Sequence, residues 1–235
     1  MNTRIKKLLE AHLNLEHTNY REIKNLCVLH DDQSPLEPVI IRKAKALALL
    51  LDETKTVILQ NELIVGLRTV YGPLETGQNV FGSFDFELPV HPATNHCLRY
   101  FPRYLTDLER EKLESVGLNE GYAIAHIPFG GQRILAHGYG GLQDWARERL
   151  KALNKSLEIP DTSSKAAFLQ AVIIIFEAAT RFVLRHGLEA DRLAHSSPDT
   201  QRQAELLRIA ATCRWIATQP PRNFYEAVQL FWFTC

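Results

Sequence analysis

The stretch that most constrains this chain is its last one, residues 219–235, which reads QPPRNFYEAVQLFWFTC. Its two prolines end the preceding helix, because proline cannot continue a helix and biases the residue before it away from helical angles. Asn223 can then cap a new helix, and Glu226 stands where a capping box needs a carboxylate. Residues 230–233 are apolar on every side, which is typical of a helix that is buried all round. We therefore expect this helix to lie in the core of the fold.

The same stretch carries no C-capping glycine and no polar tail that could satisfy its last carbonyl groups. A folded domain rarely stops inside its most hydrophobic helix, so we expect the sequence to be the front part of a longer protein, cut within a core element. The alternative is a C-terminal helix that docks into the core of a complete domain.

The composition excludes several classes of protein. A chain of 235 residues with 46% hydrophobic content can bury the core of one large domain or two small ones. Lys and Arg together number 27, as do Asp and Glu, and no basic run is present, which argues against nucleic-acid binding. The apolar run at residues 171–176 is far shorter than the roughly 20 residues of a membrane span, and the N-terminus lacks the apolar core of a signal peptide. We expect a cytoplasmic chain with no membrane or nucleic-acid partner.

The cysteines and histidines show no metal-binding pattern. The four cysteines are widely spaced, at Cys27, Cys97, Cys213 and Cys235. Without a Cys-x-x-Cys pair they fit neither a zinc site nor a disulfide scaffold, so we expect reduced, buried packing residues. The spacing of the histidines does not suggest zinc ligands either, and we predict no metal site.

Periodicity predicts about seven helices in one continuous body. Residues 35–52 repeat apolar positions at helical spacing after a proline suited to the first helical position. The longest helix is expected over residues 165–186, central in the fold and ended by Gly187. Further helices are expected over residues 106–117, in two pieces that meet at Gly138, and after Asp199 with Leu206, Leu207, Ile209 and Ala210 on the buried side.

Residues 56–66, TVILQNELIVG, are rich in β-branched side chains and predict an extended segment with a bend at its Asn-Glu pair. We expect Gly66 to stand where a side chain would not fit, and Glu62 to accept hydrogen bonds from nearby backbone amides rather than to act as an acid or base. The glycines at 138, 140 and 141 match neither phosphate-loop pattern, so close helix packing is the better interpretation.

Three stretches, in family order, resemble the glycyl radical enzymes, in particular the N-terminal part of the pyruvate formate-lyase domain. They are residues 61–66 (NELIVG), 135–142 (LAHGYGGL) and 205–230 (ELLRIAATCRWIATQPPRNFYEAVQL), of which the last is the most specific. The resemblance implies a mostly α chain, the helical and incomplete N-terminal portion of the family's α/β barrel fold. It implies a single incomplete domain over residues 1–235, with peripheral helices at 1–33 and the family-like helical body at 34–235.

The resemblance also implies a chemistry. In the family, an activating enzyme with an iron–sulfur cluster and S-adenosylmethionine makes a radical on a glycine. The radical passes to a cysteine, whose thiyl radical attacks a small-molecule substrate. Members are lyases, dehydratases or acyltransferases such as formate acetyltransferase, they belong to anaerobic metabolism, and they are usually homodimers. This sequence contains neither an Arg-Val-x-Gly segment nor a Gly-Cys-x-Glu loop. We therefore expect no cofactor in this chain and no activity from it alone.

Two residues are candidates for substrate binding. His126 lies in the run 122–128, where relatives often carry a Gly-His-Thr element that lines the substrate cavity, and a histidine there could bond a hydroxyl or move a proton. Arg133 could neutralise a substrate carboxylate. The structural alternatives are a satisfied histidine and an exposed arginine. The alternative for the whole chain is a non-catalytic helical module that binds a partner through its last helix.

Overall fold

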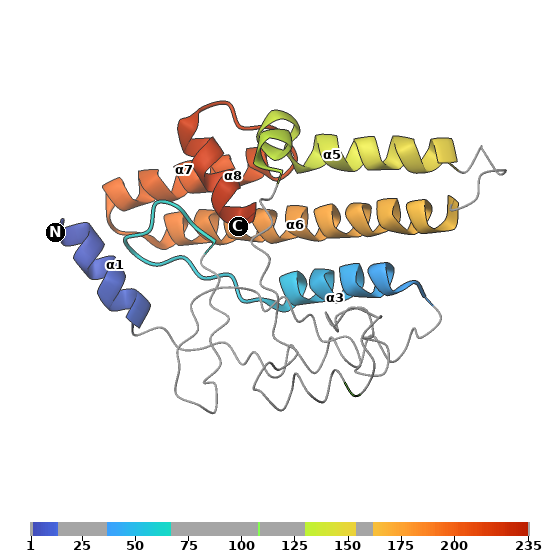
Figure 1. Cartoon of the computed structure of the whole chain (residues 1–235). Helices are drawn as coiled ribbons and strands as arrows, with labels where there is room; N and C mark the ends of the chain where they lie inside the picture. The colour runs from blue at the N-terminus through green and yellow to red at the C-terminus, as the bar shows by residue number, and fades with distance from the viewer. Residues whose placement is uncertain (1, 14–36, 67–107, 109–129, 154–161, 235) are drawn as a thin grey trace.

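The computed structural model describes residues 2–13, 37–66, 108, 130–153 and 162–234, and Figure 1 shows how their helices are arranged. The helices are α1 (Thr3–Leu13), α3 (Val39–Glu53), α5 (Gly131–Leu153), α6 (Thr162–Ser196), α7 (Thr200–Ile216) and α8 (Phe224–Thr234). No strand occurs in these ranges, so the described part of the chain is helical, as the sequence predicts. The expected helix at 106–117 and the run 122–128 lie outside the described residues, apart from helical Leu108.

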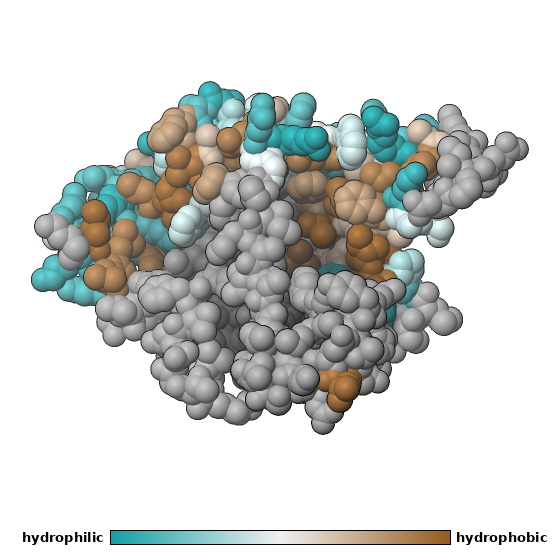
Figure 2. Space-filling view, in the orientation of Figure 1, coloured by the Kyte–Doolittle hydropathy of each residue, from teal (hydrophilic) through white to brown (hydrophobic). Residues whose placement is uncertain are grey.

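The centre of the bundle is α6, against which α3, α5 and α7 all pack. Figure 1 shows α3 and α5 along opposite sides of α6, with α8 crossing in front. Figure 2 shows hydrophilic residues along the outer edge of α5 and hydrophobic ones between α5 and α3, where α6 lies. The central position expected for this helix is therefore confirmed.

The end expected for α6 is wrong, because the helix continues through Gly187 to Ser196. Gly187 faces α7, and a Cβ atom there would lie 3.1 Å from Cβ of Cys213 and 3.4 Å from the carbonyl oxygen of Ala210. The glycine thus lets two helices approach closely. A glycine in a helix costs about 1 kcal/mol relative to alanine, and the close packing of α6 on α7 offsets this cost.

By length and composition, α6 could cross a membrane over Ser163–Ser196, and it is the one helix of the described residues that could. Three helices pack along it, however, and the core helix of a water-soluble bundle has the same composition. These contacts support a core helix.

The start expected for α3 is also wrong. The helix begins at Val39 and not at residue 35, because Glu37 and Pro38 are not helical. Pro38 has ψ 135°, an extended value, and a proline disfavours helical angles in the residue before it. No side chain caps this helix at its N-terminus. The residues that suggested the earlier start, 34 and 35, lie outside the described residues.

The interface between α3 and α6 is apolar and rich in alanine. It buries two groups of residues, Ile41, Ala44, Ala167 and Ala171 in the first and Ala48, Leu51, Ala178 and Phe182 in the second. At its end, two arginines of α6 meet the last turn of α3. Arg185 donates to the carbonyl oxygens of Asp52 (2.7 Å) and Thr54 (3.2 Å), and Arg181 pairs with the Asp52 carboxylate at 2.6 Å and 3.0 Å. These contacts satisfy carbonyl groups that a helix end leaves unbonded.

The helix α7 begins where the sequence predicts, after Asp199, whose carboxylate accepts from the backbone N–H groups of Gln201 (2.9 Å) and Arg202 (3.3 Å). The buried side includes Leu206, Ile209, Ala210 and Cys213, as expected for the first three. Leu207 is 42% exposed, so its predicted burial is wrong. Each residue turns a helix by about 100°, and the buried positions leave residue 207 on the opposite side.

Candidate functional site

The last helix, α8, has one buried face, formed by Glu226, Gln229 and Leu230. Oδ1 of Asn223 accepts from the backbone N–H of Glu226 at 3.0 Å, so the predicted cap is present. The Glu226 carboxylate reaches back one residue further than a capping box requires and accepts from the backbone N–H of Arg222 at 2.7 Å. The Arg222 guanidinium also binds this carboxylate, which holds the pKa of Glu226 below its usual range.

The prediction that the final turn of α8 is buried on every side is wrong. Leu230 is completely buried, but the side chains of Phe231 and Trp232 are 45% and 46% exposed. The reason is that α8, which lies across the bundle in Figure 1, buries only the face formed by Glu226, Gln229 and Leu230. Residues 226, 229 and 230 turn toward the bundle at helical spacing, and residues 231 and 232 turn away from it.

The predicted bend in the extended segment is a turn at residues 59–62. The backbone N–H of Glu62 donates to the carbonyl oxygen of Leu59 at 3.0 Å. In return, the Leu59 N–H donates to Oε2 of Glu62 at 2.9 Å, so the expectation that Glu62 bonds a nearby backbone amide is confirmed. Burial raises the pKa of Glu62 to about 7. This carboxyl group therefore changes charge near neutral pH.

Arg202, on α7, binds the backbone of this turn. Its guanidinium donates to the carbonyl oxygens of Glu62 (2.7 Å) and Leu59 (2.9 Å) and to the carboxylate of Glu205 (3.0 Å). Arg202 is 9% exposed. Backbone oxygen atoms that are away from water need a donor, and this arginine supplies one to Glu62 and a second one to Leu59, which also accepts from the Glu62 N–H.

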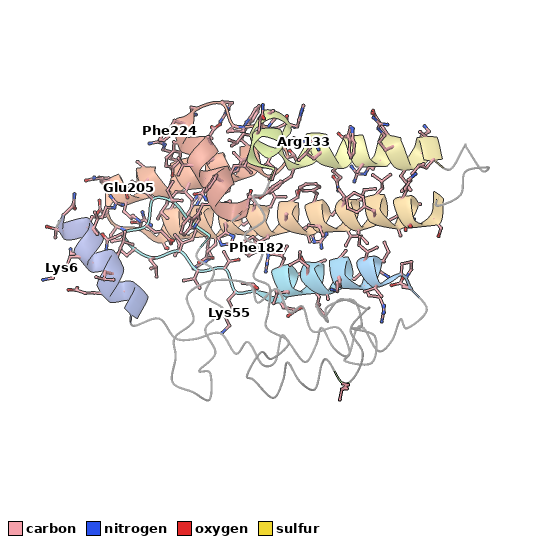
Figure 3. All side chains as sticks on the ribbon, in the orientation of Figure 1. Lys6, Lys55, Arg133, Phe182, Glu205 and Phe224 are labelled. Atoms are coloured by element: carbon pink, nitrogen blue, oxygen red, sulfur yellow. The ribbon has the colours of Figure 1, made fainter. Side chains whose placement is uncertain are left out.

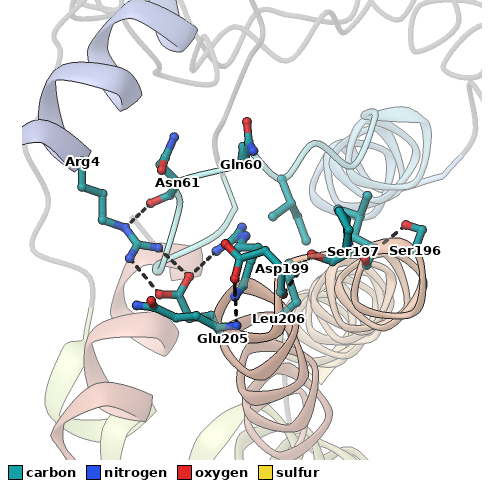
Figure 4. A pocket seen from close by; sticks show the side chains of 13 residues that line it. Arg4, Gln60, Asn61, Ser196, Ser197, Asp199, Glu205 and Leu206 are labelled. Atoms are coloured by element: carbon teal, nitrogen blue, oxygen red, sulfur yellow. Dashed lines mark hydrogen bonds and ion pairs between the residues drawn. The ribbon is translucent and has the colours of Figure 1, made fainter.

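Arg4, on α1, completes the cluster from the other side (Figure 4). It forms a bidentate pair with Glu205 at 2.7 Å and 2.8 Å, and its Nε donates to the carbonyl oxygen of Asn61 at 2.7 Å. The hydrogen bonds from Arg4 are the main reason that the pKa of Glu205 falls to about 2. A cavity of about 480 Å³ opens beside these side chains, between α1, the turn and the start of α7. Both carboxylate oxygens of Glu205 are already bonded within the protein, so the cluster is a structural clamp.

The end of the extended segment lies on α8. The side chain of Gln229 pairs with both backbone groups of Val65, accepting from its N–H at 2.9 Å and donating to its carbonyl oxygen at 2.7 Å. The Tyr225 hydroxyl donates to the carbonyl oxygen of Leu63 at 2.5 Å. Gly66 has φ 105°, and a Cβ atom there would lie 2.5 Å from Cε1 of Phe233, so the prediction that no side chain fits is confirmed.

The glycine-rich stretch packs on the connection between α7 and α8. Gly138 divides α5 into two helical pieces, as predicted, with φ 64° and ψ 176°. A Cβ atom at Gly138 would lie 2.6 Å from the carbonyl carbon of Gln219, and the N–H of Gly140 donates to the Thr218 carbonyl oxygen at 2.9 Å. Tyr139 reaches α8, where its hydroxyl lies 2.9 Å from Oγ1 of Thr234. Close packing is therefore the role of these glycines.

Two groups that could carry chemistry lie beside these contacts, and both are buried. Burial raises the pKa of the Cys213 thiol to about 12 and lowers the pKa of His186 to about 4. The His186 ring stands between the rings of Phe182 (4.6 Å) and Phe233 (5.1 Å), and its Nδ1 lies 2.9 Å from the Phe182 carbonyl oxygen. Neither group is charged at neutral pH. Cys213 is the buried packing residue that the sequence predicts, and the other cysteines lie outside the described residues.

Of the two predicted substrate-binding residues, the structure describes one. Arg133 lies on the exposed side of the first turn of α5 (Figure 3). His126 lies outside the described residues, and substrate binding by either residue stays a prediction. In the described ranges, no group of three or more His, Cys, Asp or Glu side chains could hold a metal ion.

The residues that join the stretches 61–66 and 205–230 are Arg4, Arg202 and Gln229, which sequence reasoning did not single out. One local signal was available for Gln229. It is a polar residue three positions after Glu226 on the buried face of an otherwise apolar helix, and such a residue needs a partner. For Arg4 and Arg202, no local sequence pattern predicts which carbonyl groups they bind.

Residues 59–66, 138–140 and 218–234 thus meet around α8, although they are far apart in the sequence. A family model described as pyruvate formate lyase-like matches residues 92–235, more than half of the chain. The chain belongs to the pyruvate formate lyase-like family. Its residues 218–234 lie within the matched range, and residues 59–66 lie before it.

Curated relatives agree with this family. The isethionate sulfite-lyase of Oleidesulfovibrio alaskensis is 37% identical over 103 residues, which are 44% of this chain and 12% of that protein. The (2S)-3-sulfopropanediol dehydratase of Klebsiella oxytoca is 34% identical over 123 residues, 52% of this chain and 15% of that protein.

Solved structures agree as well. A glycyl radical enzyme from Archaeoglobus fulgidus superposes with a TM-score of 0.77 at 25% identity. The B12-independent glycerol dehydratase of Clostridium butyricum superposes with 0.75 at 28% identity. Each alignment covers 99% of this chain and 33% of the solved chain. The pyruvate formate lyase-like chain described here therefore spans about a third of the solved relatives' length, and its resemblance to glycyl radical enzymes is confirmed.

Proposed function

We propose that residues 1–235 form a helical scaffold of a glycyl radical lyase or dehydratase, and that the cysteine and glycine that carry its radical are not among these residues. The observation that carries the proposal is the way the family-like stretches meet. Side chains bind backbone groups at two junctions, Arg202 with the turn and Gln229 with Val65, and a backbone hydrogen bond from Gly140 to Thr218 forms the third. Contacts of this kind hold the family-like stretches in fixed positions relative to one another.

The state of Cys213 supports the same proposal. A thiyl radical must reach both its radical source and its substrate, but Cys213 is 0% exposed and lies between α6 and α7. The sequence has no Gly-Cys-x-Glu loop and no Arg-Val-x-Gly segment. The radical-carrying residues would then be supplied by further family sequence, in the same polypeptide or in another.

The reaction class follows from the relatives. Their names describe a sulfite-lyase, dehydratases and a decarboxylase, so cleavage of a C–S, C–O or C–C bond of a small molecule is favoured over acyl transfer. We propose a radical S-adenosylmethionine activating enzyme and a homodimer partner for the whole protein, working in anaerobic metabolism in the cytoplasm. His126 and Arg133 stay candidates for substrate contact.

The experiment combines the purified chain with a relative's activating enzyme, S-adenosylmethionine and a reductant without oxygen. We expect no glycyl radical signal in the electron paramagnetic resonance spectrum and no consumption of isethionate or (2S)-3-sulfopropanediol. A polypeptide that carries the cysteine loop and the radical glycine should give both, and only when residues 1–235 are present. Turnover by residues 1–235 alone would contradict the proposal.

A second candidate function is a non-catalytic helical module that binds a partner. The exposed aromatic side chains of α8 favour it, since Phe224 is 84% exposed and Phe231 and Trp232 are nearly half exposed. Large exposed apolar patches mark interaction sites or aggregation-prone surfaces. A monodisperse chain that melts cooperatively would support this candidate, and aggregation of the purified chain would count against it.

A further inference from the structure

The carboxyl group of Glu62 is buried without a hydrogen bond from a cation of the described residues. Glu62 is 7% exposed, and its side chain accepts one hydrogen bond in this part of the chain, at Oε2 from the backbone N–H of Leu59. Burial removes the water that stabilises a charge, so a buried carboxylate normally pairs with a cation or accepts several hydrogen bonds. The position of Glu62 therefore favours the neutral, protonated form.

The two arginines beside the turn are bound to other groups. Arg4 donates to both carboxylate oxygens of Glu205. Nη1 of Arg202 donates to the same carboxylate and to the backbone carbonyl oxygen of Glu62, and its Nη2 donates to the carbonyl oxygen of Leu59. The charge of Arg202 lowers the pKa of Glu62, but burial has the larger effect and raises this pKa to about 7. The arginines thus bind the backbone of the turn and leave its carboxyl group unneutralised.

The charges around the turn are already balanced before Glu62 ionises. The charged and titratable groups that contact the turn or line the cavity beside it, among the described residues, are Arg4 from α1, Asp199, Arg202 and Glu205 from the start of α7, and Tyr225 from α8, whose hydroxyl donates to the Leu63 carbonyl oxygen (Figure 4). The two arginines match the two carboxylates, and the tyrosine is neutral. An ionised Glu62 would therefore add an uncompensated negative charge to a buried position.

We infer that the turn at residues 59–62 is a pH-sensitive contact, which leaves α7 when Glu62 loses its proton while the helices stay folded. Leaving α7 would bring the carboxylate into water, where its charge is solvated. The turn is attached through side chains of its neighbours, so it can open without breaking the hydrogen bonds within any helix. The cavity of about 480 Å³ beside it gives it space to move. This behaviour goes beyond the proposed function, because it requires no radical.

The test is hydrogen exchange of the purified full chain from about pH 5.5 to about pH 8.5, followed by NMR at the amides of Leu59 and Glu62. Each rate is divided by the rate of an unstructured peptide at the same pH. The open turn ionises with the ordinary pKa of 4.5, and the closed turn with the pKa of about 7, so opening becomes easier as the pH rises between these values. We expect the ratio to rise about 20-fold between pH 5.5 and pH 7.5 and to level off above pH 8.

Two variants assign this rise to the carboxyl group. Glu62→Gln keeps the size of the side chain and an acceptor for the Leu59 N–H but cannot ionise, so its ratio should not change with pH. Glu53→Gln is the matched control, because it makes the same chemical change at an exposed residue at the end of α3. This control should keep the full rise. The amide of Ile209, which is buried on α7, should show no comparable rise in any of the three proteins.

Four results would overturn the inference. The first is a midpoint below pH 5.5 when the carbon-13 shift of the Glu62 carboxyl group is titrated. The second is a midpoint near pH 7 without the rise in exchange, which would mean that Arg202 turns to bind the carboxylate while the turn stays closed. The third is an equal rise at Ile209, which would mean that the whole chain unfolds. The fourth is a rise that persists in Glu62→Gln. The first three need the unchanged chain alone, so they decide the question even if the variant does not fold.

Discussion

Two regions of the molecule are held to the bundle by different means. The helix α3 lies on α6 through small apolar side chains, such as Ala44 and Ala48, with arginines only at its end. Residues 59–66 are held on α7 and α8 by hydrogen bonds from side chains to backbone, made by Arg202, Arg4 and Gln229, in addition to the buried side chain of Val65. A helix bonds its own backbone and needs only apolar cover, but a segment without regular structure must borrow donors and acceptors from its neighbours.

The strongest test of this comparison is Arg202→Met. The change would leave the carbonyl oxygen of Glu62 without this donor and that of Leu59 with only its bond from the Glu62 N–H, next to a side chain that is 9% exposed. Removing one partner of a buried charged cluster costs about 3–5 kcal/mol, so we expect a loss of that order in urea unfolding. The matched control is Arg192→Met, which removes an exposed pair with Glu189 on α6 and should change little. Equal losses of unfolding free energy for Arg202→Met and Arg192→Met would contradict the claim that the buried cluster stabilises the fold more than an exposed ion pair does.

The apolar region has its own test in Ala178→Leu. Ala178 is 0% exposed and faces α3 beside Ala48. Extra methylene groups in a packed interface cost about 1–3 kcal/mol, and a thermal melt should show this loss. Ala136→Leu, at an exposed position of α5, is the control with the same chemical change. A stable Ala178→Leu variant would mean that α3 and α6 are not closely packed.

Gln229→Leu separates hydrogen bonding from packing at the second region. The side chain keeps its size but leaves the N–H and carbonyl groups of Val65 unpaired. Each unsatisfied buried group costs about 1–3 kcal/mol, and the Val65 amide should lose protection in hydrogen exchange. Gln201→Leu, on the exposed start of α7, is the control. Unchanged protection of Val65 would show that the pairing does not hold the segment.

The pH dependence gives a finer distinction, because the pKa values of Glu62 and Glu205 are shifted in opposite directions. The pKa of Glu62 is raised to about 7, so its contribution to stability is complete below its unfolded value of 4.5 and is lost as the pH rises through 7. Glu62→Gln keeps an acceptor for Leu59 and should flatten the decline between pH 5 and pH 8, by on the order of 2 kcal/mol. A decline of the same size in the variant would assign it to another group.

The pKa of Glu205 is lowered to about 2, so its contribution is present above its unfolded value of 4.5 and is lost as the pH falls toward 2. Arg4→Met should reduce this acid sensitivity. Since Arg4 is 29% exposed in its pair with Glu205, its loss should cost only about 1 kcal/mol at neutral pH. We expect this to be the smallest effect of the series, measured by urea unfolding at pH 7 and pH 3. A loss as large as that of Arg202→Met would show that Arg4 of α1 stabilises the fold as much as Arg202 of α7 does, which would contradict this expectation.

Local patterns of the sequence predicted the features that depend on neighbouring residues. The bend before Glu62, the kink at Gly138 and the caps at Asp199 and Asn223 all follow from backbone angles or hydrogen bonds within four residues. The same patterns failed where a distant contact prevailed. Gly187 reads as a helix stop, yet contact with α7 keeps it inside α6. His126 and the rest of residues 109–129 lie outside the described residues.

The sequence by itself determined the helical body, the family and the places where the backbone needs a glycine, because each of these depends on local angles or on recognisable spacing. Only the tertiary structure decided which side chains complete the turn at 59–62 and which face of α8 is buried. Arg202 binds Glu62, which is 140 positions away in the sequence, and Gln229 binds Val65, which is 164 positions away. Such a pairing is set by how helices pack in space, and no periodicity along the chain encodes it.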